Sequence, residues 1–138
     1  MMKPENFYFT CYATEDFKSK QDVSCTRALI AGFDSNNFLH SNRNWLESTE
    51  FYKNNKNILD EKRGGGYWLW KPFLIYEALK LTPRYSTLLY LDSGDYVDFG
   101  VIEHLIPIMN REDMLLLGGA YKNSDWTFKF YLFCDNNR

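Results

Sequence analysis

The sequence lacks a long hydrophobic run and a block of basic residues, and its first residues lack the pattern of a secretory leader. Its apolar stretches fall far short of the ~20 residues of a membrane-spanning helix, so we expect no membrane span. Its 16 Lys and Arg residues are outnumbered by 18 Asp and Glu residues, giving a formal net charge of −2. Because nucleic-acid-binding surfaces gather positive charge, we expect no nucleic-acid partner. The start, MMKPENFYFT, has no basic region followed by a long apolar one, which predicts a cytoplasmic protein.

The chain is also poor in residues that bind zinc or form disulfides. It has three cysteines (Cys11, Cys25 and Cys134) and two histidines (His40 and His104). There is no Cys-x-x-Cys pair, so a structural zinc site is not expected. The odd number and wide spacing of the cysteines are typical of free thiols in a reducing compartment. Both histidines are interpreted as ordinary surface or packing residues.

Aromatic residues, by contrast, are abundant, and the local patterns predict strands that alternate with helices. Aromatics make up 18% of the chain, which indicates a large core, stacking surfaces for flat ligands, or both. We expect strands at 7–13, 36–41, 87–91, 114–117 and 128–133, and helices at 17–33, 45–56, 67–81 and 101–109. Pro72 suits a first turn, so the regular part of the third helix should begin near Lys71. In the second helix, the side chains expected to turn inward are Trp45, Leu46, Phe51 and Tyr52.

This alternation predicts the α/β class, with a largely parallel sheet in one domain spanning residues 1–138. Ligands of such sheets bind beyond the carboxyl ends of the strands. We therefore expect the loops that follow Ala13 and Leu91 to face the functional site.

A tetrad of polar residues, Asp92-Ser93-Gly94-Asp95, follows the strand predicted to be most deeply buried. Two carboxylates that lie close together are unfavourable unless a cation neutralises them. Mg²⁺ and Mn²⁺ prefer oxygen ligands and are often held by one or two carboxylates together with a substrate diphosphate. The tetrad alone is slightly better explained as a tight turn, in which glycine takes a positive φ. The buried strand before it favours a metal site.

The segment 63–66, Arg-Gly-Gly-Gly, is predicted to form a flexible loop. Backbone without side chains approaches phosphates closely, and arginine binds them through two parallel hydrogen bonds. The segment lacks the Gly-x-x-x-x-Gly-Lys-Ser/Thr pattern of a P-loop. A hinge is the commoner meaning of consecutive glycines, and it remains an alternative.

The residues after this loop combine aromatic side chains with a lysine. Tyr67, Trp70 and Leu74 share one face at helical spacing, whereas core packing is expected for Trp68 and Phe73. Lysine is seldom buried without an anionic partner. One of the two aspartates or a substrate phosphate would serve Lys71, and a lysine whose stem covers apolar surface is the alternative.

The segments 63–72, RGGGYWLWKP, and 88–95, LLYLDSGD, resemble motifs of a group of bacterial and viral glycosyltransferases. These resemble members of the GT-A superfamily, which uses nucleotide-diphospho-sugars. The resemblance spans most of the chain and includes the front segment FYFTCYA, 7–13. It implies a GT-A, Rossmann-like fold: a mostly parallel sheet flanked by helices. It also implies that this chain is the N-terminal, nucleotide-sugar-binding part of a longer domain and is incomplete at its C-terminus.

The resemblance also implies roles for individual residues. Thr10 and Tyr12 would lie at the nucleotide end of the first strand, Arg63 and Lys71 would face the diphosphate or donor sugar, and Tyr67 and Trp70 would line the pocket. The positions assigned to nucleotide-sugar binding are Thr10, Tyr12, Arg63, Gly66, Tyr67, Trp70, Lys71 and Asp92.

The metal ligands that the resemblance implies, for Mn²⁺ or Mg²⁺, are Asp92 and Asp95. Asp92 takes the place of the first acid in the Asp-x-Asp motif of the superfamily. The place of the second acid is Gly94 in this chain, and Asp95 follows one position later.

The expected function is metal-assisted transfer of a hexose from a UDP- or GDP-sugar to a glycan or another hydroxyl acceptor. The residues offer no general base for this reaction. The alternatives are a non-catalytic nucleotide-sugar-binding remnant and an α/β interaction domain whose glycines form a hinge.

Overall fold

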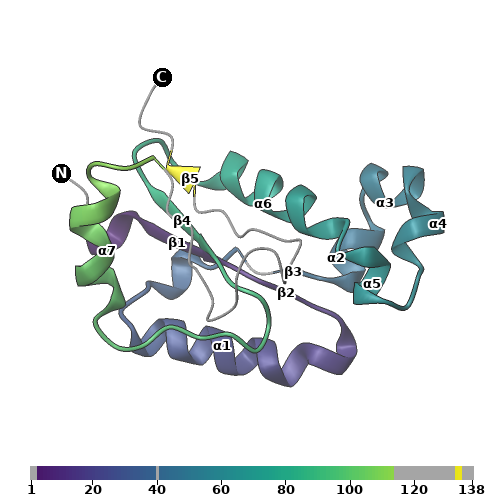
Figure 1. Ribbon diagram of the computed structural model, residues 1–138, viewed down its shortest axis with the longest axis horizontal. Helices are drawn as coiled ribbons and strands as arrows, with labels where there is room; N and C mark the ends of the chain where they lie inside the picture. The colour runs from purple at the N-terminus through teal and green to yellow at the C-terminus, as the bar shows by residue number, and fades with distance from the viewer. Residues whose placement is uncertain (1–2, 40, 114–132, 135–138) are drawn as a thin grey trace, which may run out of the picture.

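The computed structural model describes residues 3–39, 41–113 and 133–134 (Figure 1). Its strands are β1 (Phe7–Thr10), β2 (Tyr12–Ala13), β3 (Ser41–Asn42), β4 (Thr87–Tyr90) and β5 (Phe133–Cys134). Its helices are α1 (Lys18–Ile30), α2 (Arg43–Glu47), α3 (Glu50–Asn54), α4 (Lys56–Leu59), α5 (Gly64–Tyr67), α6 (Trp70–Leu81) and α7 (Val101–Met109). The 3₁₀ turns are η1 (Pro4–Asn6), η2 (Glu15–Phe17) and η3 (Ser35–Asn37).

The strands form a largely parallel arrangement. β1 pairs in parallel with β4, from Phe7 opposite Thr87 to Thr10 opposite Tyr90. β2 pairs in parallel with β3, and a single parallel bridge from Phe9 to Phe38 extends that pairing towards β1. β5 joins the free side of β4 and is antiparallel to it. The predicted α/β class is confirmed at this level.

The order of the strands in space reverses at β1, because the two strands that follow β2 in the chain, β3 and β4, lie on opposite sides of β1. It leaves β2 through α1 and reaches β3 on one side, and it then passes through α2 to α6 and reaches β4 on the other side of β1. Figure 1 shows α1 along one side of the strands and α6 along the other. Crevices beyond the carboxyl ends of strands at such a reversal are the usual ligand sites of open α/β sheets. The fold thus draws attention to the ends of β1, β2 and β4.

Side chains alternate between two hydrophobic cores, as the period of two residues along a strand requires. One core lies between the strands and helices α1 and α7. Its buried members are Phe7, Phe9, Cys11, Ala28, Ala31, Phe33, Leu89, Leu91, Val97, Ile102, Leu105 and Met109. The other lies against α2 to α6, and its buried members are Tyr12, Leu46, Tyr52, Leu59, Trp70, Leu74, Ile75 and Tyr90. Neighbouring positions on one strand, such as Leu89 and Tyr90, thus serve opposite cores.

Most of the elements predicted before residue 114 are confirmed, with two corrections. The helix predicted at 45–56 is divided into α2, α3 and α4, because Thr49 caps a new helix: its Oγ1 accepts a hydrogen bond from Tyr52 N at 3.1 Å. In this segment, the side chains of Trp45, Leu46, Phe51 and Tyr52 do turn inward as expected. The strand predicted at 36–41 begins as the 3₁₀ turn η3, because the Asp34 carboxylate accepts from Asn36 N at 2.8 Å and competes with strand pairing. Strand-like pairing is limited to the bridge at Phe38 and to β3 from Ser41.

The other predicted elements lie close to their expected bounds or outside the described residues. The first strand is divided into β1 and β2 at Cys11, the first helix begins at Lys18, and α7 is continuous through Pro107. The strand predicted at 114–117 lies outside the described residues, as does 128–133 except for Phe133. Among the helices that the structure describes, none has the length and apolar character needed to cross a membrane.

Candidate functional site at the carboxyl ends of the strands

An ion pair marks the end of β4. The Lys71 Nζ atom, in the first turn of α6, lies 2.9 Å from Oδ1 and 3.0 Å from Oδ2 of Asp92. The Tyr90 hydroxyl, from the last residue of β4, donates a hydrogen bond to Oδ1 of the same carboxylate. The expectation that Lys71 would pair with one of the two aspartates is confirmed.

Two further titratable groups in this cluster respond to the Asp92 charge. Burial and the neighbouring Asp92 carboxylate raise the pKa of Tyr90 well above its usual range, so its hydroxyl remains a hydrogen-bond donor. Partial burial, together with Asp92, raises the pKa of Asp95, whereas Lys71 lowers it. Asp95 is thus the carboxylate of this pair that lacks an ion-pair partner among the described residues.

The segment 92–95 is a tight turn, as one of the two interpretations predicted. Asp95 N donates to Asp92 O at 3.0 Å, and Gly94 has a φ of 107°. The turn is tied to α1 through the buried Ser24, whose hydroxyl donates to Asp95 O at 2.6 Å and accepts from Gly94 N at 3.3 Å. The first helix therefore fixes the position of both carboxylates.

A metal ion at this turn would have to share the Asp92 carboxylate with the groups that already bind it. Both Asp92 oxygens already bind Lys71, and one also binds Tyr90. Within the described residues, no group of three or more His, Cys, Asp and Glu side chains gathers around one point. Two carboxylates suit Mg²⁺ or Mn²⁺ where a substrate diphosphate supplies further oxygens. The donor set at 92–95 fits such a shared metal, and Lys71 is the cation that neutralises Asp92 in this structure.

Tyr12 and Trp70 lie behind the ion pair as a stacked couple. Their ring centroids are 4.1 Å apart with an interplanar angle of 26°, and both side chains are buried. Trp70 Nε1 donates to Gly64 O at 3.0 Å, which ties the ring to the glycine segment. The Tyr12 hydroxyl is buried and has no hydrogen-bond partner among the described residues. Burial raises its pKa, and the nearby Arg43 guanidinium opposes this shift through its charge and its approach to the hydroxyl, although the geometry between them is not that of a hydrogen bond.

The glycine segment is a hydrogen-bonded left-handed turn, not the flexible loop expected from its sequence. All five residues from Gly64 to Trp68 have positive φ. Tyr67 N donates to Arg63 O at 2.7 Å, and Trp68 N donates to Gly64 O at 3.2 Å. Glycine adopts this conformation readily, whereas Tyr67 and Trp68 each pay roughly 1–2 kcal/mol.

This turn decides where the aromatic side chains go. Tyr67 is 51% exposed and does not share a helical face with Trp70, because α6 begins only at Trp70. Trp68, expected in the core, is partly exposed, and its ring lies against Gly64. Phe73 does pack as expected, stacked on Phe51 at 4.1 Å.

The remaining candidate residues serve different purposes. Thr10 is fully buried, and its hydroxyl donates to Leu39 O at 2.8 Å, so in this structure it joins β1 to the segment that precedes β3. Gly66 is buried against α4, where a Cβ would lie 2.5 Å from Leu59 Cα. The exposed Arg63 side chain makes no hydrogen bond or ion pair with the described residues and is available to an anion.

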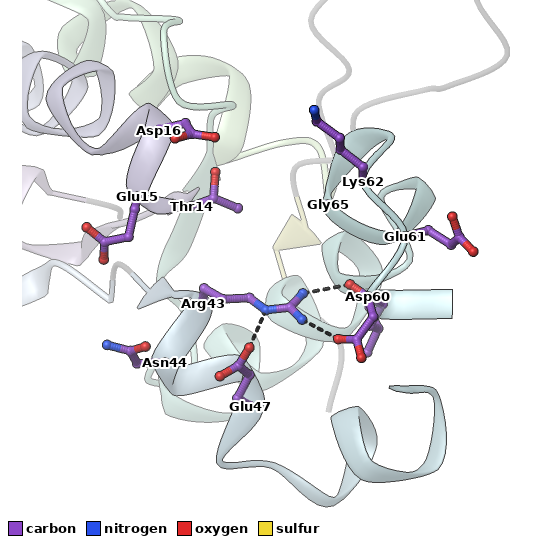
Figure 2. Close-up of a pocket in the computed structure, with 11 residues that line it drawn as sticks. Thr14, Glu15, Asp16, Arg43, Asn44, Glu47, Asp60, Glu61, Lys62 and Gly65 are labelled. Carbon is purple, nitrogen blue, oxygen red and sulfur yellow. Dashed lines mark hydrogen bonds and ion pairs between the residues drawn. The ribbon is translucent and has the colours of Figure 1, made fainter. Parts of the chain in front are cut away.

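A pocket of about 340 Å³ lies beyond the ends of β2 and β3, next to the left-handed turn (Figure 2). Thr14 follows β2 and Arg43 follows β3, and Gly65 connects the pocket to the left-handed turn. The lining residues are Thr14, Glu15, Asp16, Arg43, Asn44, Glu47, Leu59, Asp60, Glu61, Lys62 and Gly65. Carboxylates predominate, so the pocket itself is unfavourable for a diphosphate and favours neutral polar or cationic groups.

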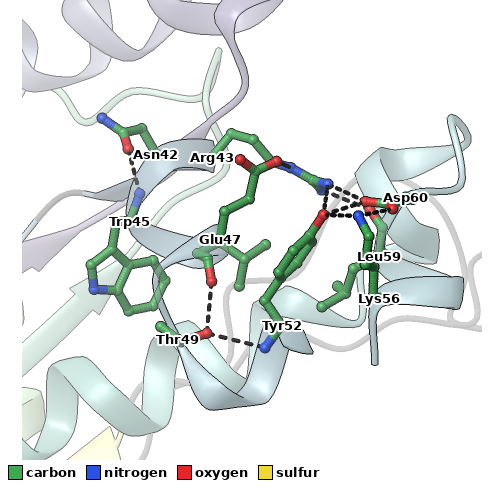
Figure 3. Close-up of polar contacts among 10 residues, drawn as sticks. Asn42, Arg43, Trp45, Glu47, Thr49, Tyr52, Lys56, Leu59 and Asp60 are labelled. Carbon is green, nitrogen blue, oxygen red and sulfur yellow. Dashed lines mark hydrogen bonds and ion pairs between the residues drawn. The ribbon is translucent and has the colours of Figure 1, made fainter. Parts of the chain in front are cut away.

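Arg43 holds one wall of this pocket in place. Its guanidinium donates to Glu47 Oε1 at 2.7 Å, to Asp60 Oδ1 at 2.6 Å and to Leu59 O at 2.6 Å. Figure 3 shows that Tyr52 and Lys56 complete the network around Asp60, at 2.6 Å each. Hydrogen bonds from Lys56 and Tyr52 lower the pKa of Asp60 to about 2. The local signals of this wall in the sequence are the i,i+4 spacings of Arg43 with Glu47 and of Lys56 with Asp60, which are common on exposed helices and did not single it out.

Comparisons of the chain with protein-family models, with curated proteins and with solved structures gave no match.

Proposed function

We propose that the chain binds the nucleotide-diphospho-sugar donor of a glycosyltransferase reaction, as the donor-binding part of a GT-A-type enzyme. One observation carries this proposal: Lys71, Asp92 and Asp95 gather where the order of the parallel strands reverses. This is the part of an open α/β sheet where nucleotides usually bind. The motif resemblance at 63–72 and 88–95 points to the same residues.

The chemistry of the cluster suits the departure of a nucleoside diphosphate. Lys71 offers an ammonium that already faces two anionic oxygens, and the exposed Arg63 offers a second cation from the neighbouring turn. Asp92 and Asp95 would hold Mn²⁺ or Mg²⁺ together with the donor. Such an ion supplies stabilisation of the negative charge on the leaving phosphate. Tyr90 keeps Asp92 oriented by hydrogen bonding.

The donor's other groups have a place beside this cluster. The adjacent pocket offers carboxylates and the Asn44 amide, which bind hydroxyl and amide groups well. Its surplus of negative charge keeps the diphosphate outside, towards Lys71 and Arg63. We propose that the hexose is transferred to a glycan or another hydroxyl acceptor.

Ligand-dependent thermal stability tests this proposal. A ligand that binds only the folded state stabilises it, by about 2.7 kcal/mol at 100 times its Kd. We expect a UDP- or GDP-sugar with MnCl₂ to raise the melting temperature of the chain. Asp92→Asn should abolish the shift, whereas the matched variant Asp98→Asn, in the exposed loop beyond the turn, should retain it.

The outcomes separate the candidate functions. An unchanged melting temperature across a panel of nucleotide sugars contradicts the proposal and favours an α/β interaction domain. A shift without donor hydrolysis or transfer identifies a non-catalytic binding remnant. A shift with turnover identifies the enzyme.

A further inference from the structure

Two cysteines far apart in sequence lie next to each other in the first core. The Sγ atoms of Cys11, which follows β1, and Cys25, in α1, are 3.9 Å apart. Both are free thiols. The separation is that of a weak sulfur hydrogen bond, and the sulfurs would have to approach by about 2 Å to form a disulfide of 2.03–2.05 Å.

The two thiols differ in exposure and in pKa, and these differences indicate which of them an oxidant would attack first. Cys11 is fully buried, whereas Cys25 is partly exposed and accessible to small molecules. The hydrogen bond from the Cys11 thiol lowers the pKa of Cys25, with partial burial and the nearby Asp22 opposing this effect. The same interaction and burial raise the pKa of Cys11. Cys25 is therefore the thiol that reacts first, because the thiolate is the nucleophile.

We propose that Cys11 and Cys25 are a modification site that forms a reversible disulfide on exposure to a hydroperoxide. In the first step, the Cys25 thiolate attacks a peroxide oxygen, an S–O bond forms, the O–O bond breaks and hydroxide leaves as water. In the second step, Cys11 loses its proton and attacks the Cys25 sulfur, the S–S bond forms, the S–O bond breaks and hydroxide takes up that proton and leaves as a second water. The two thiols together lose two electrons, and hydrogen peroxide is reduced to two molecules of water.

The disulfide would act on the carboxylate turn through a single neighbouring residue. Ser24 precedes Cys25 and makes both hydrogen bonds that tie Gly94 and Asp95 to α1. Drawing Cys25 about 2 Å towards Cys11 displaces this part of the helix relative to the turn. The geometry therefore connects the thiol state to the position of Asp92 and Asp95. The effect on donor binding rests on the proposed function, whereas the disulfide does not.

Peptide mapping tests the modification directly. The purified chain is treated with about one equivalent of hydrogen peroxide, alkylated without reduction and digested. We expect a peptide pair linked through Cys11 and Cys25, a mass loss of two hydrogens, and reversal by dithiothreitol. Cys134→Ser should form the same link, whereas Cys25→Ser and Cys11→Ser should not.

Other products overturn the proposal. Oxidation of Cys25 to sulfinic acid without a link, links made only through Cys134, or three alkylated thiols after treatment would each do so. The folded state of both cysteine variants is checked by circular dichroism. The Cys134→Ser result decides the matter if either of the other variants fails to fold.

Two readouts then test the connection to the turn. Hydrogen exchange of the Gly94 amide should become about five- to tenfold faster in the disulfide form, as loss of its hydrogen bond to Ser24 predicts. Ser24→Ala should show the same faster exchange without oxidation. Equal exchange in the thiol and disulfide forms overturns the connection.

Donor binding is measured on both forms. Loss of the thermal shift only in the disulfide form supports regulation of the donor site, whereas an equal shift in both forms overturns it. A chain that forms the disulfide yet binds no donor in either state refutes the proposed function and leaves the modification site standing.

Discussion

Lys71 Nζ lies within 3.0 Å of both carboxylate oxygens of Asp92, although 21 residues separate them in the chain. The pair joins the first turn of α6 to the end of β4. Its side chains are 13% and 33% exposed, so water screens the interaction less than in a surface pair. The Tyr90 hydroxyl donates a hydrogen bond to the same carboxylate. The link positions a charged cluster at the strand ends, and it also contributes to stability.

Replacing Lys71 should change both the stability of the protein and the electrostatics of the cluster at the strand ends. Lys71→Met leaves the Asp92 carboxylate without its cation, and we expect a loss of about 1–3 kcal/mol in the free energy of unfolding. The same variant should raise the pKa of Asp95 further, because Lys71 lowers it in the native protein. Asp92→Asn should lower the Asp95 pKa, because it removes the neighbouring negative charge. Urea unfolding and carboxyl-carbon NMR titration measure these effects.

The control for this variant is Lys80→Met. Lys80 makes an exposed i,i+3 pair with Glu77 at 2.6 Å, and such pairs contribute less than about 1 kcal/mol. Equal losses in the two variants, or an Asp95 pKa that does not respond to Lys71, would show that the Lys71–Asp92 pair is only a surface contact.

This pair was predictable from sequence because a buried lysine needs an anion and strand ends of a parallel sheet meet at one edge. The alternation of strands and helices was also predictable, because the spacing of apolar residues that distinguishes them is a local property of the sequence. The contact between Ser24 and the turn at Gly94 and Asp95 was not predictable. It joins residues 70 and 71 positions apart through a hydroxyl that has no distinctive sequence pattern.

The handedness of the glycine segment was missed for a different reason. Three glycines permit many conformations, and the sequence does not show which one packing selects. The structure selects a left-handed turn because Gly66 must pass close to α4 and Trp68 must cover Gly64. The hydrogen bond from the Thr10 hydroxyl to Leu39 O was likewise not predictable, because no local pattern reveals it.

The glycines of this turn should differ in their tolerance of alanine. At Gly66, φ is 98° and a Cβ would lie 2.5 Å from Leu59 Cα, so backbone has to move. At Gly65, φ is 57° and the closest atom to a Cβ would be 3.6 Å away. We expect Gly65→Ala to lower the free energy of unfolding by about 1–2 kcal/mol. Gly66→Ala should lower it by more than about 3 kcal/mol, because overpacking adds to the strain.

Thermal and urea unfolding of both variants measure this difference. Gly100→Ala provides a further reference, since Gly100 also has a positive φ, of 81°, and an added Cβ would lie no closer than 3.8 Å to the nearest atom, Glu103 Oε2. If Gly66→Ala is no more destabilised than Gly65→Ala, the close approach of the turn to α4 is wrong.

Two of the three buried tyrosines of the second core, Tyr12 and Tyr52, should change the free energy of unfolding in opposite directions when their hydroxyls are removed. The Tyr12 hydroxyl is buried without a partner in the described part of the chain, so Tyr12→Phe removes an unsatisfied group. We expect it to raise the free energy of unfolding by about 1–2 kcal/mol. The Tyr52 hydroxyl donates to Asp60 at 2.6 Å and accepts from Lys56 at 2.8 Å. We expect Tyr52→Phe to lower the free energy of unfolding by about 1–3 kcal/mol.

The pair of variants is its own control, because each change deletes one oxygen from a buried ring in the same core. Urea unfolding at neutral pH gives both values. A loss of stability in Tyr12→Phe comparable with that in Tyr52→Phe would show that the Tyr12 hydroxyl has a hydrogen-bond partner in the folded protein.

Acid should weaken the wall of the pocket through Asp60. Hydrogen bonds from Lys56 and Tyr52 lower the Asp60 pKa from 3.8 to about 2. A carboxylate with a lowered pKa contributes stability that is fully present above its unfolded value and is lost as the pH falls through its folded value. The free energy of unfolding should therefore decrease as the pH falls from about 4 to about 2. Asp60→Asn should be less stable at neutral pH and should show a shallower decrease in that range.

The matched variant for this test is Glu61→Gln, which removes an acid from the same pocket wall. Glu61 makes no ion pair with another described residue, so its variant should keep the decrease of the native protein. Unfolding in urea at a series of pH values between 2 and 5 separates the two variants. Equal pH dependence of Asp60→Asn and the native chain would mean that Lys56, Tyr52 and Arg43 do not hold the Asp60 carboxylate in solution. In that case Arg43 would lack its anchor at Asp60, and the pocket would not keep the wall that Figure 3 shows.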